Sequence, residues 1–159
     1  MNNSYTGVIK VVVSDTNGNT ANFVDEATGR GKSFGADPLV TIFYLPAGQT
    51  TFSVNINPLT TEAANNVIAA LRNDLTKATS AVISSANLDI ATKYGISDAS
   101  NQEELLTDPP LLLIDSKGVM NPKFDPYGLA LAIKSVVDDN PSMSMKDAVI
   151  ALAQNPLYS

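Results

Sequence analysis

The stretch Asn55-Ile56-Asn57-Pro58-Leu59-Thr60-Thr61 marks the point at which the sequence changes from β-rich to helical. Before Pro58, short runs rich in β-branched residues alternate with turn residues, and after it Ala-rich segments with helical spacing dominate. Asn57 is a suitable N-cap, and Pro58 fits the first helical position because the N–H there has no intrahelical partner. The sequence therefore predicts that a strand ends at this junction and that a helix begins there.

The residues before the junction predict an antiparallel sheet. Four runs have strand character, namely residues 8–13, 20–24, 39–45 and 50–56. The pair Asn17-Gly18 between the first two runs is typical of a tight hairpin turn. In the fourth run Phe52, Val54 and Ile56 alternate with polar residues, which is the period of a half-buried strand.

The residues after the junction predict helices with recognisable ends. Helical spacing covers residues 58–71, 79–94, 126–137 and 145–154. Gly95 is placed to end the second of these helices, Asp125 to cap the third, and Ser144 with Asp147 to cap the fourth. The apolar run 111–114 is interpreted as a buried strand or extended segment.

These elements together predict an α+β fold. We expect a small antiparallel sheet packed against three or four helices. A chain of 159 residues has the usual size of one domain, so we expect residues 1–159 to form a single domain with a β-rich portion 1–57 and a mainly helical portion 58–159.

The composition excludes much of the usual enzyme chemistry. The chain has no His, no Cys and no Trp, which removes Ser-His-Asp and Cys-His nucleophiles, imidazole and thiolate metal sites, and disulfides. Its net charge of −6 and its dispersed basic residues argue against nucleic acid as a partner. No apolar run is long enough to span a bilayer, and no signal peptide is recognisable at Met1, so this segment is not expected to insert into a membrane.

Two loop motifs resemble known binding loops. Gly31-Lys32-Ser33 ends like a phosphate-binding loop, but Glu26 stands where that motif needs its first glycine. Asp15, Asn17, Asn19 and Glu26 match four ligand positions of a calcium loop, although the sharp-turn position carries no glycine. We therefore expect a plain hairpin, no cofactor and no metal, with these four residues as the candidate calcium ligands.

Paired carboxylates are the remaining acid/base apparatus, and all of them stand in polar surroundings. The pairs are Asp25 with Glu26, Glu103 with Glu104, and Asp138 with Asp139. Burial is what raises the pKa of a carboxyl group enough for acid catalysis, and nothing in these contexts predicts it. The five tyrosines are scattered along the chain, so core or helix-end packing is expected for Tyr5, Tyr44, Tyr94, Tyr127 and Tyr158. We expect no catalytic residues.

A family resemblance extends from the junction through the helical part. The stretches Asn55–Thr61, Ser80–Asn87, Tyr94–Ile96 and Tyr127–Ser135 resemble a class of bacterial secreted and cell-surface proteins in which an immunoglobulin-like or carboxypeptidase-regulatory-like β-portion is followed by helices. Glu62 departs from that pattern, where leucine is usual. The resemblance implies that the sheet is a half-sandwich of immunoglobulin-like type. It also implies an exported, non-catalytic module located in the cell envelope or outside the cell.

Three functions are consistent with the sequence. The first is a structural or adhesive module of an exported bacterial surface protein, in contact with a surface partner or with neighbouring domains of a longer chain. The alternative is a small-ligand or ion-binding module that uses the loops between residues 15 and 37. The third is a hydrolase that works with carboxylates.

Overall fold

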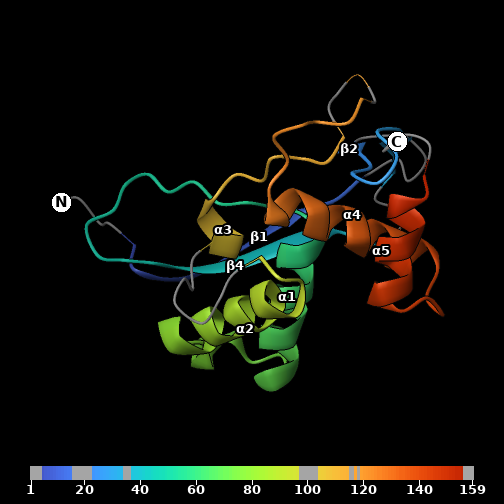
Figure 1. Ribbon diagram of the computed structural model, residues 1–159. Helices are drawn as coiled ribbons and strands as arrows, with labels where there is room; N and C mark the ends of the chain where they lie inside the picture. The colour runs from blue at the N-terminus through green and yellow to red at the C-terminus, as the bar shows by residue number, and fades with distance from the viewer. Residues whose placement is uncertain are drawn as a thin grey trace. The chain divides into compact units, whose positions relative to one another are not determined.

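The computed structural model describes residues 5–15, 23–33, 37–96, 104–114, 117 and 119–155, and it has an α+β fold (Figure 1). The predicted fold class is therefore confirmed. Its contacts divide the chain into two compact units. Unit 1 consists of Met1–Val13 and Leu39–Asp108, and unit 2 of Ser14–Pro38 and Pro109–Ser159. Each unit combines strands with helices, so the division does not follow the expected portions 1–57 and 58–159, and the single domain stays a prediction.

Unit 1 is built on a ribbon of two antiparallel strands. Strand β1 (Gly7–Val13) pairs with β4 (Leu39–Leu45) along its whole length. Helices α1 (Pro58–Ala70) and α2 (Ser80–Lys93) pack on this ribbon and on each other (Figure 1). The core between ribbon and helices consists of Val40, Ile42, Ala64, Val67, Ile83 and Ala86.

The junction between β-rich and helical sequence forms as predicted. The Asn57 side chain accepts hydrogen bonds from the backbone N–H groups of Leu59 (2.9 Å) and Thr60 (3.0 Å). The Thr60 hydroxyl in turn accepts from the Asn57 N–H at 2.9 Å, which completes a capping box at the start of α1. The Val40 N–H donates to the Thr61 hydroxyl at 2.9 Å, so the helix start is also tied to β4.

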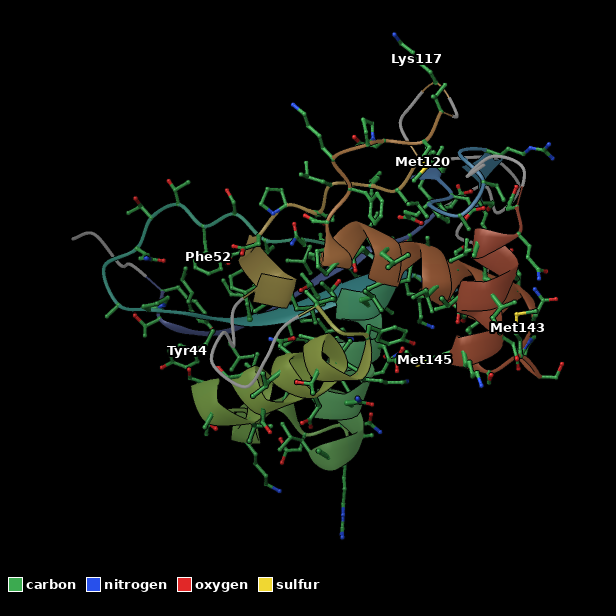
Figure 2. All side chains as sticks on the ribbon, in the orientation of Figure 1. Tyr44, Phe52, Lys117, Met120, Met143 and Met145 are labelled. Atoms are coloured by element: carbon green, nitrogen blue, oxygen red, sulfur yellow. The ribbon has the colours of Figure 1, made fainter. Side chains whose placement is uncertain are left out.

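The expected single sheet of four strands is wrong in two places. Residues 50–56 form no strand; there the Asn55 N–H donates instead to Leu106 O at 2.7 Å, in the short helix α3 (Glu104–Thr107). Phe52 of this extended segment (labelled in Figure 2) stacks on the ring of Phe43, with centroids 5.0 Å apart. The alternation of apolar and polar residues in 50–56 therefore reflects the packing of one face of an extended segment that has no neighbouring strand in the described part of the chain.

The second difference concerns the hairpin expected after β1. Strand β2 (Phe23–Val24) pairs antiparallel with β3 (Gly31–Lys32) in a separate two-stranded sheet, while the partner of β1 is β4. The turn predicted at Asn17-Gly18 lies outside the described residues. Pairing with β4 gives β1 a partner that matches it residue for residue over seven positions, which two residues of β2 cannot provide.

Unit 2 contains β2, β3 and the helices α4 (Pro126–Asp139) and α5 (Met145–Ala153), which begin at the caps that the sequence predicts. Asp125 caps α4 by accepting from the Gly128 N–H at 2.7 Å, and its second oxygen accepts from the Leu111 N–H at 3.1 Å. The run 111–114 is extended, as interpreted, and ends in a bridge between Ile114 and Met120. Leu113 and Ile114 are buried, whereas Leu111 is 50% exposed. None of the described helices combines the length and apolar character needed to cross a membrane.

Candidate functional site

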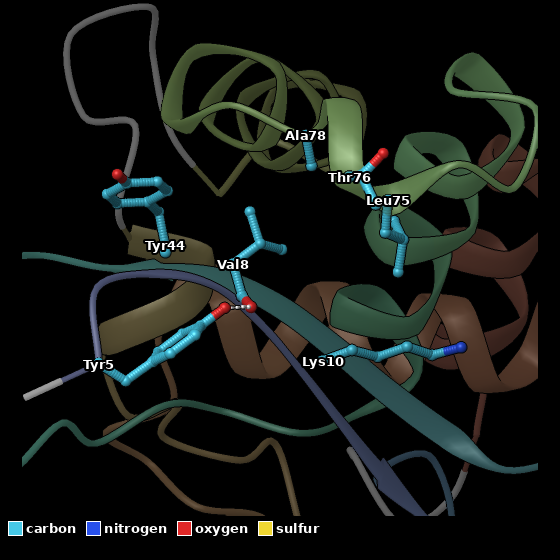
Figure 3. Close-up of a pocket in the computed structure, with 8 residues that line it drawn as sticks. Tyr5, Val8, Lys10, Tyr44, Leu75, Thr76 and Ala78 are labelled. Atoms are coloured by element: carbon cyan, nitrogen blue, oxygen red, sulfur yellow. Dashed lines mark hydrogen bonds between the residues drawn. The ribbon is translucent and has the colours of Figure 1, made fainter. Parts of the chain in front are cut away.

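A hollow of about 410 Å³ opens on unit 1 between the strand ribbon and the turn that joins α1 to α2. Its floor is the ribbon, and one wall is the short 3-10 helix η1 (Leu75–Lys77). The lining residues described by the structure are Tyr5, Gly7, Val8, Lys10, Tyr44, Leu75, Thr76 and Ala78. Figure 3 shows the two tyrosines at one end of this hollow and the Lys10 side chain at the other. We call it the Tyr5–Tyr44 hollow.

The register of the ribbon brings the two tyrosines together. Tyr44 in β4 lies opposite Val8 in β1, and the Tyr5 hydroxyl donates a hydrogen bond to Val8 O at 3.0 Å (Figure 3). Both rings remain accessible, with 59% of Tyr5 and 36% of Tyr44 exposed. Packing was expected for all five tyrosines, and for these two that expectation is wrong. It is confirmed for Tyr94 and Tyr127, which are buried, and Tyr158 lies outside the described residues.

Gly7 allows Tyr5 to fold back over the strand. Its φ of +140° is a conformation that residues with a side chain rarely adopt. A Cβ added at this position would stand 3.1 Å from the Tyr5 hydroxyl oxygen. A glycine at residue 7 therefore shapes the end of the hollow that carries the aromatic rings.

The η1 wall is fixed by a local network around Asp74. The Asp74 carboxylate caps η1 by accepting from the Thr76 N–H at 3.3 Å and from the Thr76 hydroxyl, and it forms an ion pair with Lys77 at 3.0 Å. The hydrogen bond from the Thr76 side chain, followed by that from Lys77, lowers the pKa of Asp74. These bonds hold Thr76 at the rim of the hollow, with its hydroxyl hydrogen directed at the Asp74 carboxylate.

The charge of the hollow differs from that of the whole chain. Among the described residues that line it, Lys10 alone carries a charge, and the remaining polar groups are tyrosine and threonine hydroxyls. The full chain has a net charge of −6. The hollow therefore offers aromatic faces, hydroxyls and one ammonium group, a set that suits a ligand with an apolar face and an anionic substituent.

A second polar cluster lies in unit 2, where the sequence predicted solvated carboxylates. Asp25 and Glu26 are only 4% and 7% exposed, so the expectation of a solvated pair is wrong here. Asp25 accepts hydrogen bonds from the hydroxyls of Thr28 and of Ser135 in α4. Ser135 lies 110 positions away in sequence, so its approach to Asp25 is a long-range contact that a reading of local surroundings misses.

Burial changes the acid strength of Glu26. Loss of hydration raises the pKa of this carboxyl group from 4.5 to about 7, and the negative charge of Asp25 adds to the rise, while its own backbone N–H and Lys32 oppose it. Its Oε2 atom is buried and accepts no hydrogen bond from the protein. The Lys32 ammonium lies 2.6 Å from Asp139 and 3.5 Å from the Ser135 hydroxyl.

Only two of the four candidate calcium ligands lie within the described residues. Asp15 and Glu26 are described, whereas Asn17 and Asn19 lie outside the described residues. Within the described ranges, no group of three or more acidic side chains could hold a metal ion. In the loop that resembles a phosphate site, Gly31 and Lys32 form β3, and the Lys32 side chain is engaged by Asp139.

Of the other two carboxylate pairs, Asp138 with Asp139 is the one that the structure describes in full. Asp138 and Asp139 are exposed, as expected, and form ion pairs with Lys134 and Lys32. Glu103 and the side chain of Glu104 lie outside what the structure describes. Glu62 joins α1 to α2, since its carboxylate contacts Lys93 at 2.5 Å and the Tyr94 hydroxyl at 3.0 Å.

Comparison with known proteins identifies no relative. No protein-family model matches the chain, and neither a curated protein nor a solved structure matches it significantly. The functional argument therefore rests on the chemistry of the two sites above.

Proposed function

We propose that the chain is a non-catalytic structural or adhesive module of an exported bacterial envelope or surface protein, and that the Tyr5–Tyr44 hollow is its contact surface. The exposure of two tyrosine rings at one hollow carries this proposal. Large aromatic side chains are usually buried, and exposed ones beside a hollow are typical of surfaces that bind a ligand. The envelope location comes from the sequence resemblance described above.

The ligand class follows from the lining. A sugar ring presents a C–H face that packs on a tyrosine ring, and hydroxyls that pair with the hydroxyls of Thr76 and the tyrosines. An acidic sugar adds a carboxylate that pairs with the Lys10 ammonium. The hollow is open to solvent and has a volume of about 410 Å³, which suits one or two rings of a longer saccharide held by an adhesive module.

The test is an NMR titration of the 15N-labelled chain with D-galacturonate, and with D-galactose as its neutral counterpart. We expect amide shifts in β1, β4 and η1, with galacturonate the tighter ligand because it alone can pair with Lys10. Tyr44→Ala should weaken both sugars about three- to tenfold, which corresponds to one aromatic contact. Lys10→Gln should weaken galacturonate and leave galactose unchanged.

Lys123→Gln is the matched control, because Lys123 is an exposed lysine of unit 2 that does not line the hollow. It should bind both sugars as the wild type does. The proposal is contradicted if millimolar sugar shifts no amide around the hollow. It is equally contradicted if Lys10→Gln and Lys123→Gln change the affinity for galacturonate by the same factor. The loss of any positive charge would then weaken binding, whether or not the lysine lines the hollow.

A further inference from the structure

The segment from Phe23 to Lys32 is fastened to α4 by two side-chain contacts one helical turn apart. The Ser135 hydroxyl donates a hydrogen bond to the Asp25 carboxylate, and Asp139 forms an ion pair with Lys32 at 2.6 Å. Within the segment, the Asp25 N–H donates to Arg30 O at 2.8 Å and the Gly29 N–H donates to Asp25 O at 2.7 Å. The segment is thus an ordered hairpin that meets the helix through polar groups. We call it the 23–32 hairpin.

Ionisation of Glu26 is unfavourable while the hairpin is closed. Glu26 is buried, and its Oε2 atom has no hydrogen-bond donor in the protein. The charged groups around it are Asp25 in the same turn and Lys32 in β3, and Lys32 already shares its charge with Asp139 of α4. Arg30, also in the hairpin, is exposed. A second carboxylate charge beside Asp25 is therefore costly as long as the hairpin stays closed.

We propose that the 23–32 hairpin is a proton-operated latch on α4, which is closed while Glu26 is protonated and released when Glu26 ionises. Release hydrates the Glu26 carboxylate and separates it from Asp25. It breaks the contacts of Asp25 with Ser135 and of Lys32 with Asp139, so that the face of α4 carrying Ser135 becomes accessible. Regulation of this kind is independent of the Tyr5–Tyr44 hollow, because no residue of the hairpin lines it.

The size of the effect follows from proton linkage. Burial holds the pKa of Glu26 at about 7 in the closed state, and opening restores the ordinary value of 4.5. Between pH 4.5 and pH 7, closing of the hairpin is therefore coupled to uptake of a proton by Glu26. The opening equilibrium constant should then rise on the order of 50-fold between pH 5 and pH 8. Nearly all of this change lies below pH 7.5, where few other groups of a chain without histidine titrate.

Hydrogen exchange of the intact chain tests the latch. Because Asp25 and Glu26 are neighbours in the turn of the hairpin, release that separates their carboxylates also opens this turn. The reporters are therefore the amides of Asp25 and Gly29, whose hydrogen bonds hold the turn, and the amides of α1 serve as the internal reference. After correction for the intrinsic exchange rate, we expect opening at the reporters to increase on the order of 50-fold from pH 5 to pH 8. Opening in α1 should change far less.

Two variants and one direct titration make the test decisive. Glu26→Gln, which keeps the shape and cannot ionise, should remove the pH dependence at the reporters, whereas Asp89→Asn, at an exposed site on α2, should retain it. The latch is refuted if the wild-type reporters show no pH dependence or if Glu26→Gln retains it. Should Glu26→Gln fail to fold, the 13C resonance of the Glu26 carboxyl in the wild type decides: titration near pH 7 supports the latch and titration near 4.5 overturns it.

Discussion

Tyr44 lies opposite Val8 in the β1–β4 ribbon, and the carbonyl of that same Val8 accepts the hydrogen bond of the Tyr5 hydroxyl at 3.0 Å. One backbone position thus fixes two aromatic rings that come from different parts of the chain. The arrangement depends on strand register, because a slip by one residue would move Tyr44 to the other face of the ribbon. The proposed contact surface therefore depends on the pairing of Tyr44 with Val8.

Gly7→Ala should disturb the aromatic end of the hollow. Residue 7 has a φ of +140°, and the new Cβ would also press on the Tyr5 hydroxyl. We expect a loss of about 1–2 kcal/mol in the free energy of unfolding in urea, together with weaker galacturonate binding. Gly95→Ala is the matched control, since its φ is +72° and its Cβ would meet nothing within 4 Å. It should lose stability through strain alone and bind as the wild type does.

Leu59→Ala tests the packing of the junction. Leu59 has no exposed surface, and it follows directly on the Asn57 cap that ties α1 to β4. Removal of its side chain should lower the free energy of unfolding by about 2–4 kcal/mol, because the cavity closes only in part. Pro58→Ala should cost less than about 1 kcal/mol, since proline there only preorganises the helix start. Equal losses in the two variants would contradict this account of the junction.

Gly128→Ala should be the most damaging alanine substitution in unit 2. A Cβ at residue 128 would stand 2.0 Å from Leu111 O, so the extended segment 111–114 or the first turn of α4 must move. The displacement would also break the hydrogen bonds that Asp125 makes with both elements. We expect a loss of about 3 kcal/mol or more in urea unfolding. A loss similar to that of an exposed helical substitution would contradict the close approach.

The stability of the wild type should fall as pH rises from about 4.5 to 7. In this range burial keeps Glu26 protonated in the folded state, because its pKa is raised to about 7, whereas the unfolded chain has already lost that proton. Stability from this group is complete below pH 4.5 and is lost as pH approaches 7. At pH 8 the wild type should be less stable than Glu26→Gln by about 2 kcal/mol, measured by urea unfolding. A Glu26→Gln variant less stable than the wild type at pH 8 would contradict the buried charge penalty.

Local sequence chemistry predicted the helices well. Asn57, Asp125 and Ser144 each cap a helix as expected, because capping involves only residues within a few positions of one another. The φ of +72° at Gly95 likewise agrees with its predicted role after α2. Residues 50–56 were wrongly predicted as a strand, since alternation shows which side chains are buried but not whether a strand lies alongside.

The candidate sites depend on contacts that local patterns do not contain. Tyr5 and Tyr44 line the same hollow because β1 pairs with β4 in this register, and Asp25 accepts a hydrogen bond from Ser135, which lies far along the chain in α4. The sequence did hold one signal for the hollow, namely a tyrosine two residues before a glycine at the start of the first strand. Glu26 follows the charged Asp25 and precedes a stretch with turn residues, so its local surroundings did not predict its burial.

The most direct test of the proposed contact surface is the position of a bound sugar. Intermolecular NOEs between 13C-labelled chain and unlabelled D-galacturonate locate the ligand by proton contacts. We expect NOEs from the ring protons of Tyr5 and Tyr44 to the C–H face of the sugar, and from the side chain of Thr76 at the rim. NOEs confined to the surface groove between α1 and α2 that Asn66 and Asp89 line, or none to either tyrosine, would contradict the assignment of the Tyr5–Tyr44 hollow as the binding surface.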